Sequence, residues 1–230
     1  MTQIPLDDFI LENKIIGFFD DPITLKSGRQ SHFYVNWRKA TNDAYLLDQT
    51  TDYLIDFLRT APFSWNSLYG VPEGATKLAV IASFKWAKAA LDFSKDNYII
   101  PMGRAKPKPH GQPADKFFIG QPKGKTVVIE DTATTGLSLL KTLDELLEQG
   151  IDVVAAITLT DRMEKRDDGQ SVAEEVASRY QGKIQYHTLS QATNLLPKAA
   201  QLTPPSPKAQ AALTKEFEQY GSRKLDWSLT

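Results

Sequence analysis

The chain has 230 residues, of which 41% are hydrophobic and 24% are charged, and its 27 Lys and Arg nearly balance 28 Asp and Glu. This length suits one main core, and the composition is typical of a globular protein, which excludes a mainly disordered or fibrous chain. The chain has no cysteine. Disulfide frameworks, Cys-ligated zinc, iron–sulfur clusters and thiolate nucleophiles are therefore excluded. A formal net charge of -1 predicts no general attraction to nucleic acid.

The N-terminal segment, residues 1–21, is acidic and interrupted by polar residues, so it lacks the basic and apolar regions of a signal peptide. Apolar runs such as residues 153–157 are far shorter than the ~20 residues that a membrane-spanning helix needs. We therefore expect a soluble cytoplasmic protein with no membrane partner.

Residues 1–60 have a mixed pattern that differs from the rest of the chain. Residues 7–17 and 46–59 predict helices. Between them, residues 23–37 predict two extended segments around Ser27, Gly28, Arg29 and Gln30, which is a hairpin signal. We expect these 60 residues to form a small hood on the main core.

Residues 61–194 alternate between apolar runs and helical patterns. Runs at 97–102, 126–130 and 152–158 predict buried strands, with weaker candidates at 66–71 and 183–187. Helical periodicity covers 75–91, 137–148 and 171–180, and Gly150 is placed to cap the second of these helices. This alternation predicts an α/β fold, with a mostly parallel central sheet flanked by helices.

Two stretches lack the pattern of a core element. Residues 103–125 are rich in proline, glycine and lysine, which predicts a long, exposed and mobile loop. After Asn194, residues 196–210 predict an extended linker, followed by a polar helix near 209–220. We assign 195–230 to a C-terminal extension of unknown role.

The most specific element is VVIEDTATTGLS at 127–138, which is a strand, two adjacent acids, a loop of small residues and a helix. Backbone N–H groups at such a helix start bind phosphate, and Glu130 and Asp131 suit ribose hydroxyls or a metal. The simpler interpretation is a strand that ends in two acids before a capped helix. The run has neither GKS/GKT nor GxGxxG, which argues against nucleoside triphosphatases and dinucleotide dehydrogenases.

This run resembles the phosphoribosyl pyrophosphate (PRPP) motif of type I phosphoribosyltransferases. The resemblance implies a small N-terminal hood on the family's α/β core. It also implies that PRPP is bound by Glu130, Asp131, Thr132, Ala133, Thr134, Thr135, Gly136, Leu137 and Ser138.

A second run, ITLKSGRQSHFYVNWR at 23–38, resembles the N-terminal signature of orotate phosphoribosyltransferases, although His32 stands where proline is usual. The resemblance implies that this hairpin binds the base: Lys26 contacts orotate, Tyr34 and Val35 line its ring, and Thr134 lies beside it. The simpler interpretation is a solvated basic hairpin.

Three further segments fit the same family. In TDRMEKRDDG at 160–169, the resemblance implies that Arg162 pairs with the orotate carboxylate, whereas the simpler interpretation is a surface ion pair with Asp161. GRAKPKPHG at 103–111 is similar to the family's mobile pyrophosphate loop, with Arg104, Lys108 and His110 at the expected spacing and Ala105 in place of a basic residue. YGVPEGATKLA at 69–79 carries Glu73 and Gly74 where relatives often have Tyr and Lys, and Lys77 is a candidate substitute cation.

The resemblance implies transfer of ribose 5-phosphate from PRPP to orotate. Lys108 is the expected main catalytic cation, and Asp131 of the acidic pair is the second expected catalytic residue. Mg²⁺ is expected to bind mainly through PRPP rather than at a protein metal site. A homodimer, whose loop reaches the neighbour's site, is also implied. Two alternatives stay open: a paralogue acting on another base, suggested by His32, Glu73 and Ala105, and a non-catalytic PRPP-binding regulator.

Overall fold

Four parallel strands form the central sheet of the computed structural model, which describes residues 3–104, 106–110 and 116–228. They are β3 (Ser67–Gly70), β6 (Thr126–Ala133), β7 (Val153–Asp161) and β8 (Gln185–Gln191), in the order β3-β6-β7-β8. Val128 of β6 is the register partner of Tyr69 on one side and of Ala156 on the other. The predicted α/β fold with a parallel sheet is confirmed.

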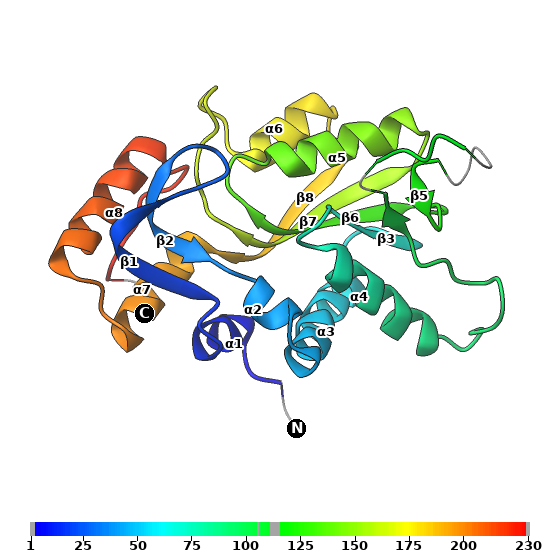
Figure 1. Ribbon diagram of the computed structural model, residues 1–230, viewed down its shortest axis with the longest axis horizontal. Coiled ribbons are helices and arrows are strands. Elements are labelled where there is room, and N and C mark those ends of the chain that lie inside the picture. The colour runs from blue at the N-terminus through cyan, green and yellow to red at the C-terminus, as the bar shows by residue number, and fades with distance from the viewer. Residues whose placement is uncertain (1–2, 105, 111–115, 229–230) are drawn as a thin grey trace.

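Both faces of the sheet are covered by helices, as Figure 1 shows. The helices α5 (Leu137–Glu148) and α6 (Val172–Arg179) cover one face, and α3 (Ala44–Thr60) and α4 (Thr76–Lys88) cover the other. Successive side chains of a strand point to opposite faces. Val128 therefore packs in the α5 core, whereas Val127 and Ile129 pack in the core shared with α3 and α4. This double burial explains the continuous apolar run of β6.

Four elements of the expected hood, residues 1–60, make up its hairpin and the flanking helices: α1 (Leu6–Glu12), β1 (Ile16–Thr24), β2 (Gln30–Val35) and the short α2 (Arg38–Thr41). The helix expected at 46–59 is α3, which lies with α4 on a face of the sheet. β1 and β2 form an antiparallel hairpin, which confirms the prediction for residues 23–37. Gly28 in its turn has a φ of +83°, a conformation that favours glycine. The first helix ends at Glu12, before the predicted Gly17, because Lys14 has a positive φ and the chain then enters β1.

The prediction of a core strand at 97–102 is wrong. Only Met102–Gly103 pairs, as β4, and its partner is the short antiparallel β5 (Phe118–Ile119) rather than the central sheet. Pro101 has no N–H to donate to a ladder, so it disfavours a continuous strand here. Ile100 is accordingly exposed.

The predicted linker at 196–210 is wrong over its first half, because α7 (Ala192–Leu202) continues to Leu202. Leu195, Leu196 and Ala199 are buried on one side of this helix, so packing offsets the backbone bond that Pro197 removes. The final helix, α8 (Pro207–Tyr220), has its first residue at the proline and is capped by Ser206. Figure 1 shows α8 beside the β1–β2 hairpin, and Phe217 and Phe33 stack with their ring centroids 5.9 Å apart.

Candidate active site

A cavity of about 370 Å³ lies where β6 and β7 end, between the sheet and the hood hairpin. In open α/β sheets, ligands bind beyond the carboxyl ends of the strands. The cavity brings together nine of the residues singled out in the sequence: Lys26, Tyr34, Val35, Glu130, Asp131, Thr132, Thr134, Ser138 and Arg162. A neighbouring cavity of about 430 Å³ shares Lys26 and Ser138 with it and is also lined by Arg104.

The predicted phosphate loop connects β6 to α5. Gly136 at its end has a φ of +70°, and a Cβ added there would lie 2.9 Å from the Val172 side chain. Glycine is therefore required both by the backbone conformation and by the close approach of α6. Thr135 and Ala133 are buried, and Leu137 is exposed at the start of α5.

Two arginines, Arg162 and Arg166, donate hydrogen bonds to carbonyls of this loop, and only Arg162 was singled out in the sequence. The Arg166 guanidinium donates to the Thr135 carbonyl at 2.6 Å, and the Arg162 backbone N–H donates to the Ala133 carbonyl at 2.9 Å. The loop after β7 therefore supports the phosphate loop. Arg166 belongs to the same TDRMEKRDDG run, but its spacing gave no sign of this contact.

Glu130 and Asp131 stand at the end of β6 with different surroundings. Glu130 is buried, and burial together with the neighbouring Asp131 raises its pKa well above the ordinary value. Asp131 accepts a hydrogen bond from the Thr132 N–H at 2.9 Å. A Cβ on Gly74 would lie 2.8 Å from the Asp131 carboxylate, so the loop after β3 approaches this acid closely because Gly74 has no side chain.

The hood hairpin reaches the phosphate loop through one direct contact. The Lys26 Nζ donates to the Ser138 Oγ at 2.9 Å, which joins the expected base end of the cavity to the expected phosphate end. Tyr34 accepts from the Arg38 guanidinium at 2.5 Å.

Two buried polar atoms at the cavity have no hydrogen-bond partner within the described part of the chain. They are Asn36 Oδ1 and Thr132 Oγ1, and both residues line the cavity. Buried polar groups are nearly always satisfied in folded proteins, so such atoms indicate a place for a polar ligand. Asn36 was part of the hairpin signature, but nothing in the sequence distinguished its role.

Arg162 is buried, and most of its hydrogen-bonding capacity is already used. Its Nε donates to Glu164 at 2.8 Å, Nη1 to the Phe33 carbonyl at 3.3 Å, and Nη2 to Ser31 at 2.9 Å and Glu216 at 3.4 Å. Its guanidinium carbon lies 3.7 Å from the centre of the Phe33 ring. These bonds use four of the five N–H donors of a guanidinium. The expected two-bond fork to a carboxylate is therefore not available in this arrangement, which leaves one N–H of Nη1. The simpler interpretation, a surface ion pair with Asp161, is wrong, because Arg162 is buried and pairs with other acids.

Arg29 of the hairpin turn continues this buried network. It pairs with Glu164 at 3.3 Å and Asp167 at 2.7 Å, and its guanidinium carbon lies 4.5 Å from the centre of the Tyr220 ring. Arg29 thus ties the hairpin to the loop after β7. The sequence gave Arg29 no role beyond its place in the hairpin signature.

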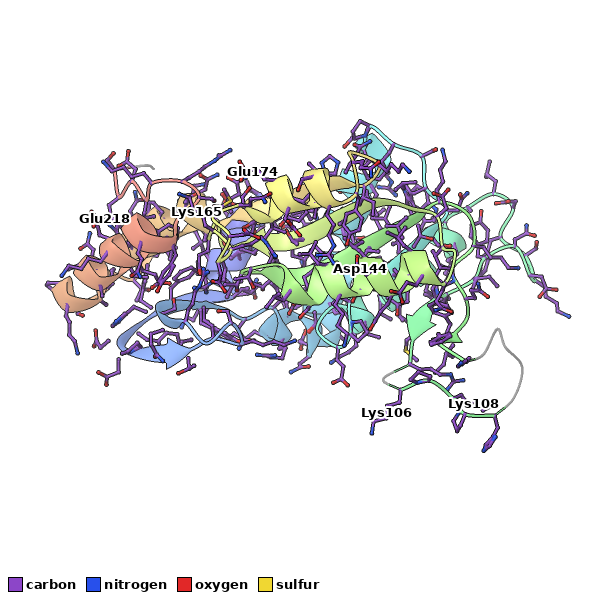
Figure 2. The ribbon with its side chains drawn as sticks, turned by 90° about the horizontal axis from the view of Figure 1, so that it is seen from above. Lys106, Lys108, Asp144, Lys165, Glu174 and Glu218 are labelled. Carbon is purple, nitrogen blue, oxygen red and sulfur yellow. The ribbon has the colours of Figure 1, made fainter. Side chains whose placement is uncertain are left out.

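The basic residues of the 103–125 segment lie apart from the cavity. Lys108 and His110 are exposed, and neither is among the residues that line the two cavities. Figure 2 shows Lys106 and Lys108 on a segment at the edge of the molecule. Arg104 is half-buried and its Nε donates to the Phe118 carbonyl at 3.2 Å. Ala105 and Gly111 lie outside the described residues.

The loop after β3 brings an acid, and no lysine, to the cavity. Glu73 lines it beside Gly74. The Lys77 Nζ donates to Asn42 Oδ1 at 2.8 Å and so is engaged with the end of α2 instead. Lys77 does not supply the substitute cation in this arrangement.

No family model matches the chain. It is 34% identical over 156 residues to the orotate phosphoribosyltransferase of Streptomyces coelicolor, covering 65% of this chain and 81% of that protein. It is 33% identical over 172 residues to the orotate phosphoribosyltransferase of Rhodopseudomonas palustris, covering 67% of this chain and 80% of that protein. The chain belongs to the orotate phosphoribosyltransferase family.

Solved structures share the family fold at low sequence identity. The orotate phosphoribosyltransferase of Francisella tularensis has a TM-score of 0.67 and 19% identity, with 94% of this chain and 98% of that chain covered. The orotate phosphoribosyltransferase of Mycobacterium tuberculosis in complex with PRPP has a TM-score of 0.53 and 21% identity, with 83% of this chain and 96% of that chain covered. These likenesses agree with the type I phosphoribosyltransferase fold.

Proposed function

We propose that this protein is an orotate phosphoribosyltransferase, which transfers ribose 5-phosphate from PRPP to orotate and releases pyrophosphate, a step of pyrimidine nucleotide biosynthesis. The observation that carries the proposal is that residues of both signatures, the phosphate loop and the base-binding hairpin, line one cavity. The contact between Lys26 and Ser138 joins the two signatures directly. Family membership supports the same conclusion.

The difficult step is cleavage of the bond between the anomeric carbon and the pyrophosphate oxygen. The orotate ring nitrogen forms the new bond to that carbon and gives up its proton to water, and pyrophosphate leaves with the electrons of the broken carbon–oxygen bond. Glu130 and Asp131 hold the ribose hydroxyls, and the negative charge of the pair favours a cationic sugar in the transition state. The loop 132–138 holds the 5′-phosphate through backbone N–H groups and hydroxyls. Binding both substrates in one cavity orients them for transfer.

Arg104, Lys108 and His110 are the proposed partners of the departing pyrophosphate, with Lys108 as the main catalytic cation. Arg104 already lines the neighbouring cavity. Lys108 is exposed and must move with its segment to reach the substrate. A cation on a segment that moves can neutralise the leaving group and then allow its release.

Mg²⁺ is the proposed cofactor. The acids Glu130 and Asp131 and the unpartnered Thr132 hydroxyl present hard oxygen atoms at the cavity, which is the ligand type that Mg²⁺ prefers. Among the described residues, no group of three or more His, Cys, Asp or Glu side chains forms a protein metal site. We propose that the ion is held mainly through PRPP, where it would neutralise part of the pyrophosphate charge.

Transfer to a different base remains the second candidate, and the occupied guanidinium of Arg162 favours it. A side chain with one N–H to offer recognises a carboxylate less strongly than a two-bond fork does. Lys26 still supplies a cation at the same cavity, which favours an acidic pyrimidine.

The proposal extends to the assembly and the compartment. The homodimer is supported by the family resemblance of the sequence motifs. In the described residues, no helix has the length and apolar character needed to cross a membrane. From the family resemblance we propose a cytoplasmic homodimer, and light scattering after gel filtration would measure its mass.

The first experiment follows the loss of orotate absorbance with purified protein, PRPP and Mg²⁺. We expect orotate consumption, and we expect Asp131→Asn to lower kcat/KM for PRPP by about 10²-fold, since it removes a charge directed at the developing cation. Asp152→Asn is the matched control, because Asp152 is exposed and lies just before the start of β7, at the opposite end of the strand from the cavity.

The outcomes separate the candidates. No turnover of orotate despite calorimetric binding of PRPP would contradict the proposal. Turnover of another base would then identify the paralogue, and no turnover of any base would identify a regulator.

A further inference from the structure

Four buried charged side chains form an alternating chain beside the cavity. Arg29 pairs with Glu164 at 3.3 Å, Glu164 with Arg162 at 2.8 Å, and Arg162 with Glu216 at 3.4 Å. The side chains of all four are at most 9% exposed. Glu216 is the member that comes from the C-terminal extension, 54 residues after Arg162.

Glu216 uses its two carboxylate oxygens on two different targets. Oε1 accepts from Nη2 of Arg162 at 3.4 Å, and Oε2 accepts from the backbone N–H of His32 at 3.3 Å. The next residue, Phe217, stacks on Phe33, the ring over which the Arg162 guanidinium lies. Helix α8 therefore holds the guanidinium and the ring beneath it at the same time.

The four bonds of Arg162 fix the plane of its guanidinium. Nη2 has two hydrogens, and Ser31 and Glu216 accept both of them. With Nε bonded to Glu164 and one hydrogen of Nη1 to the Phe33 carbonyl, the remaining donor is the second hydrogen of Nη1. Arg162 also lines the cavity, and by elimination this hydrogen is the donor that it has left for a ligand there.

We propose that Glu216 is a positioning residue for base recognition: helix α8, through Glu216, holds the Arg162 guanidinium in the orientation that presents its one remaining N–H to the base. This inference rests on the proposed function and assigns a part of it to the C-terminal extension. It predicts that loss of Glu216 weakens binding of the base more than binding of PRPP, because the phosphate loop makes no contact with Glu216 among the described hydrogen bonds.

The test compares Glu216→Gln with Glu218→Gln. Both residues lie on α8, but Glu218 is exposed and points away from the hairpin side (Figure 2). For Glu216→Gln, we expect the KM for orotate to rise about tenfold, a size typical of coupled neighbours. The KM for PRPP should change less than twofold, and Glu218→Gln should behave as the unmodified protein.

A second pair of variants distinguishes positioning from a merely structural role. In an Arg162→Gln background, Glu216→Gln should no longer change the KM for orotate, because its effect passes through the arginine. Glu216→Asp keeps the charge but shortens the side chain, so its KM for orotate should lie between those of the unmodified protein and Glu216→Gln. Thermal unfolding of each variant shows whether it is folded, and Glu216→Asp serves as the test if Glu216→Gln is not.

Three results would overturn the positioning role alone, and a fourth would overturn the proposed function as well. If the unmodified protein consumes orotate and Glu216→Gln has the same KM for orotate, the positioning role is wrong and the proposed function stands. Equal changes in both KM values, or an undiminished effect in the Arg162→Gln background, would also overturn the positioning role. If the unmodified protein consumes no orotate, the proposed function fails and the positioning role fails with it.

Discussion

Two groups of basic side chains in this protein differ in how they are held. In the network beside the cavity, the side chains of Arg29 and Arg162 are at most 9% exposed, and each contacts two carboxylates. Lys106, Lys108 and His110, which follow Arg104, are exposed. Buried charges need nearby partners, whereas exposed charges keep their hydration and their freedom to move.

This difference matches two tasks of the proposed reaction. A base that must be recognised in one orientation requires donors that do not move. A pyrophosphate that must leave requires cations that can follow it and withdraw. Substitutions of the buried arginines should therefore mainly lower the free energy of unfolding. Substitutions of the exposed cations should mainly lower turnover.

The largest effect is expected for Arg162→Ala. It leaves Glu164 and Glu216 buried without their shared partner, which lowers the free energy of unfolding by about 3–5 kcal/mol. Chemical denaturation would measure this loss. A change below about 1 kcal/mol would contradict the view that this arginine is held by the buried network.

Lys108→Ala should show the opposite signature. We expect kcat to fall by about 10²–10³-fold, as for removal of a group that stabilises transition-state charge. The free energy of unfolding should stay within about 0.5 kcal/mol, because the side chain is exposed. Orotate turnover and denaturation of the same sample check both parts, and unchanged kcat would remove Lys108 from the catalytic machinery.

Glu130→Gln should stabilise the protein at neutral pH, by about 1–3 kcal/mol, because burial of the carboxylate is costly. The pKa of Glu130 is raised in the folded state, so its protonated form favours folding. This stabilising contribution of protonated Glu130 is complete at pH values below its ordinary pKa of 4.5. It is lost as the pH rises through the raised pKa of the folded state.

Glu130→Gln should therefore raise the free energy of unfolding by a large amount at pH 8 and by a small amount at pH 4. Unfolding without ligands at the two pH values measures it. A gain that is the same at both would show that the charge of Glu130 is not the cause.

The smallest effect is expected for Lys106→Ala. Lys106 lies near Lys108 but does not line either cavity, so we expect less than about threefold loss of kcat and no change in stability. The variant is the matched control for Lys108→Ala. Equal losses in the two variants would mean that the segment contributes general positive charge rather than one defined cation.

Much of the fold was predictable because its signals are local. The apolar run at 126–130, the hairpin turn around Gly28 and the helix at 137–148 depend on residues that are close in sequence, and all three are present. The strand prediction at 97–102 failed where a proline interrupted an otherwise suitable run. The helix at 192–202 was missed because burial of its apolar side outweighs the local penalty of Pro197.

By itself, the sequence determined the order of the motifs, the parallel sheet and the residues that meet at the ends of its strands. The chemistry of each motif is encoded by residue type and spacing, and strand ends of a parallel sheet meet at one edge. Only the tertiary structure decided that Arg162 is held by Glu216 and that Lys26 reaches Ser138. Those contacts join residues 54 and 112 positions apart, and such pairs meet only when the packing of whole helices and strands brings them together.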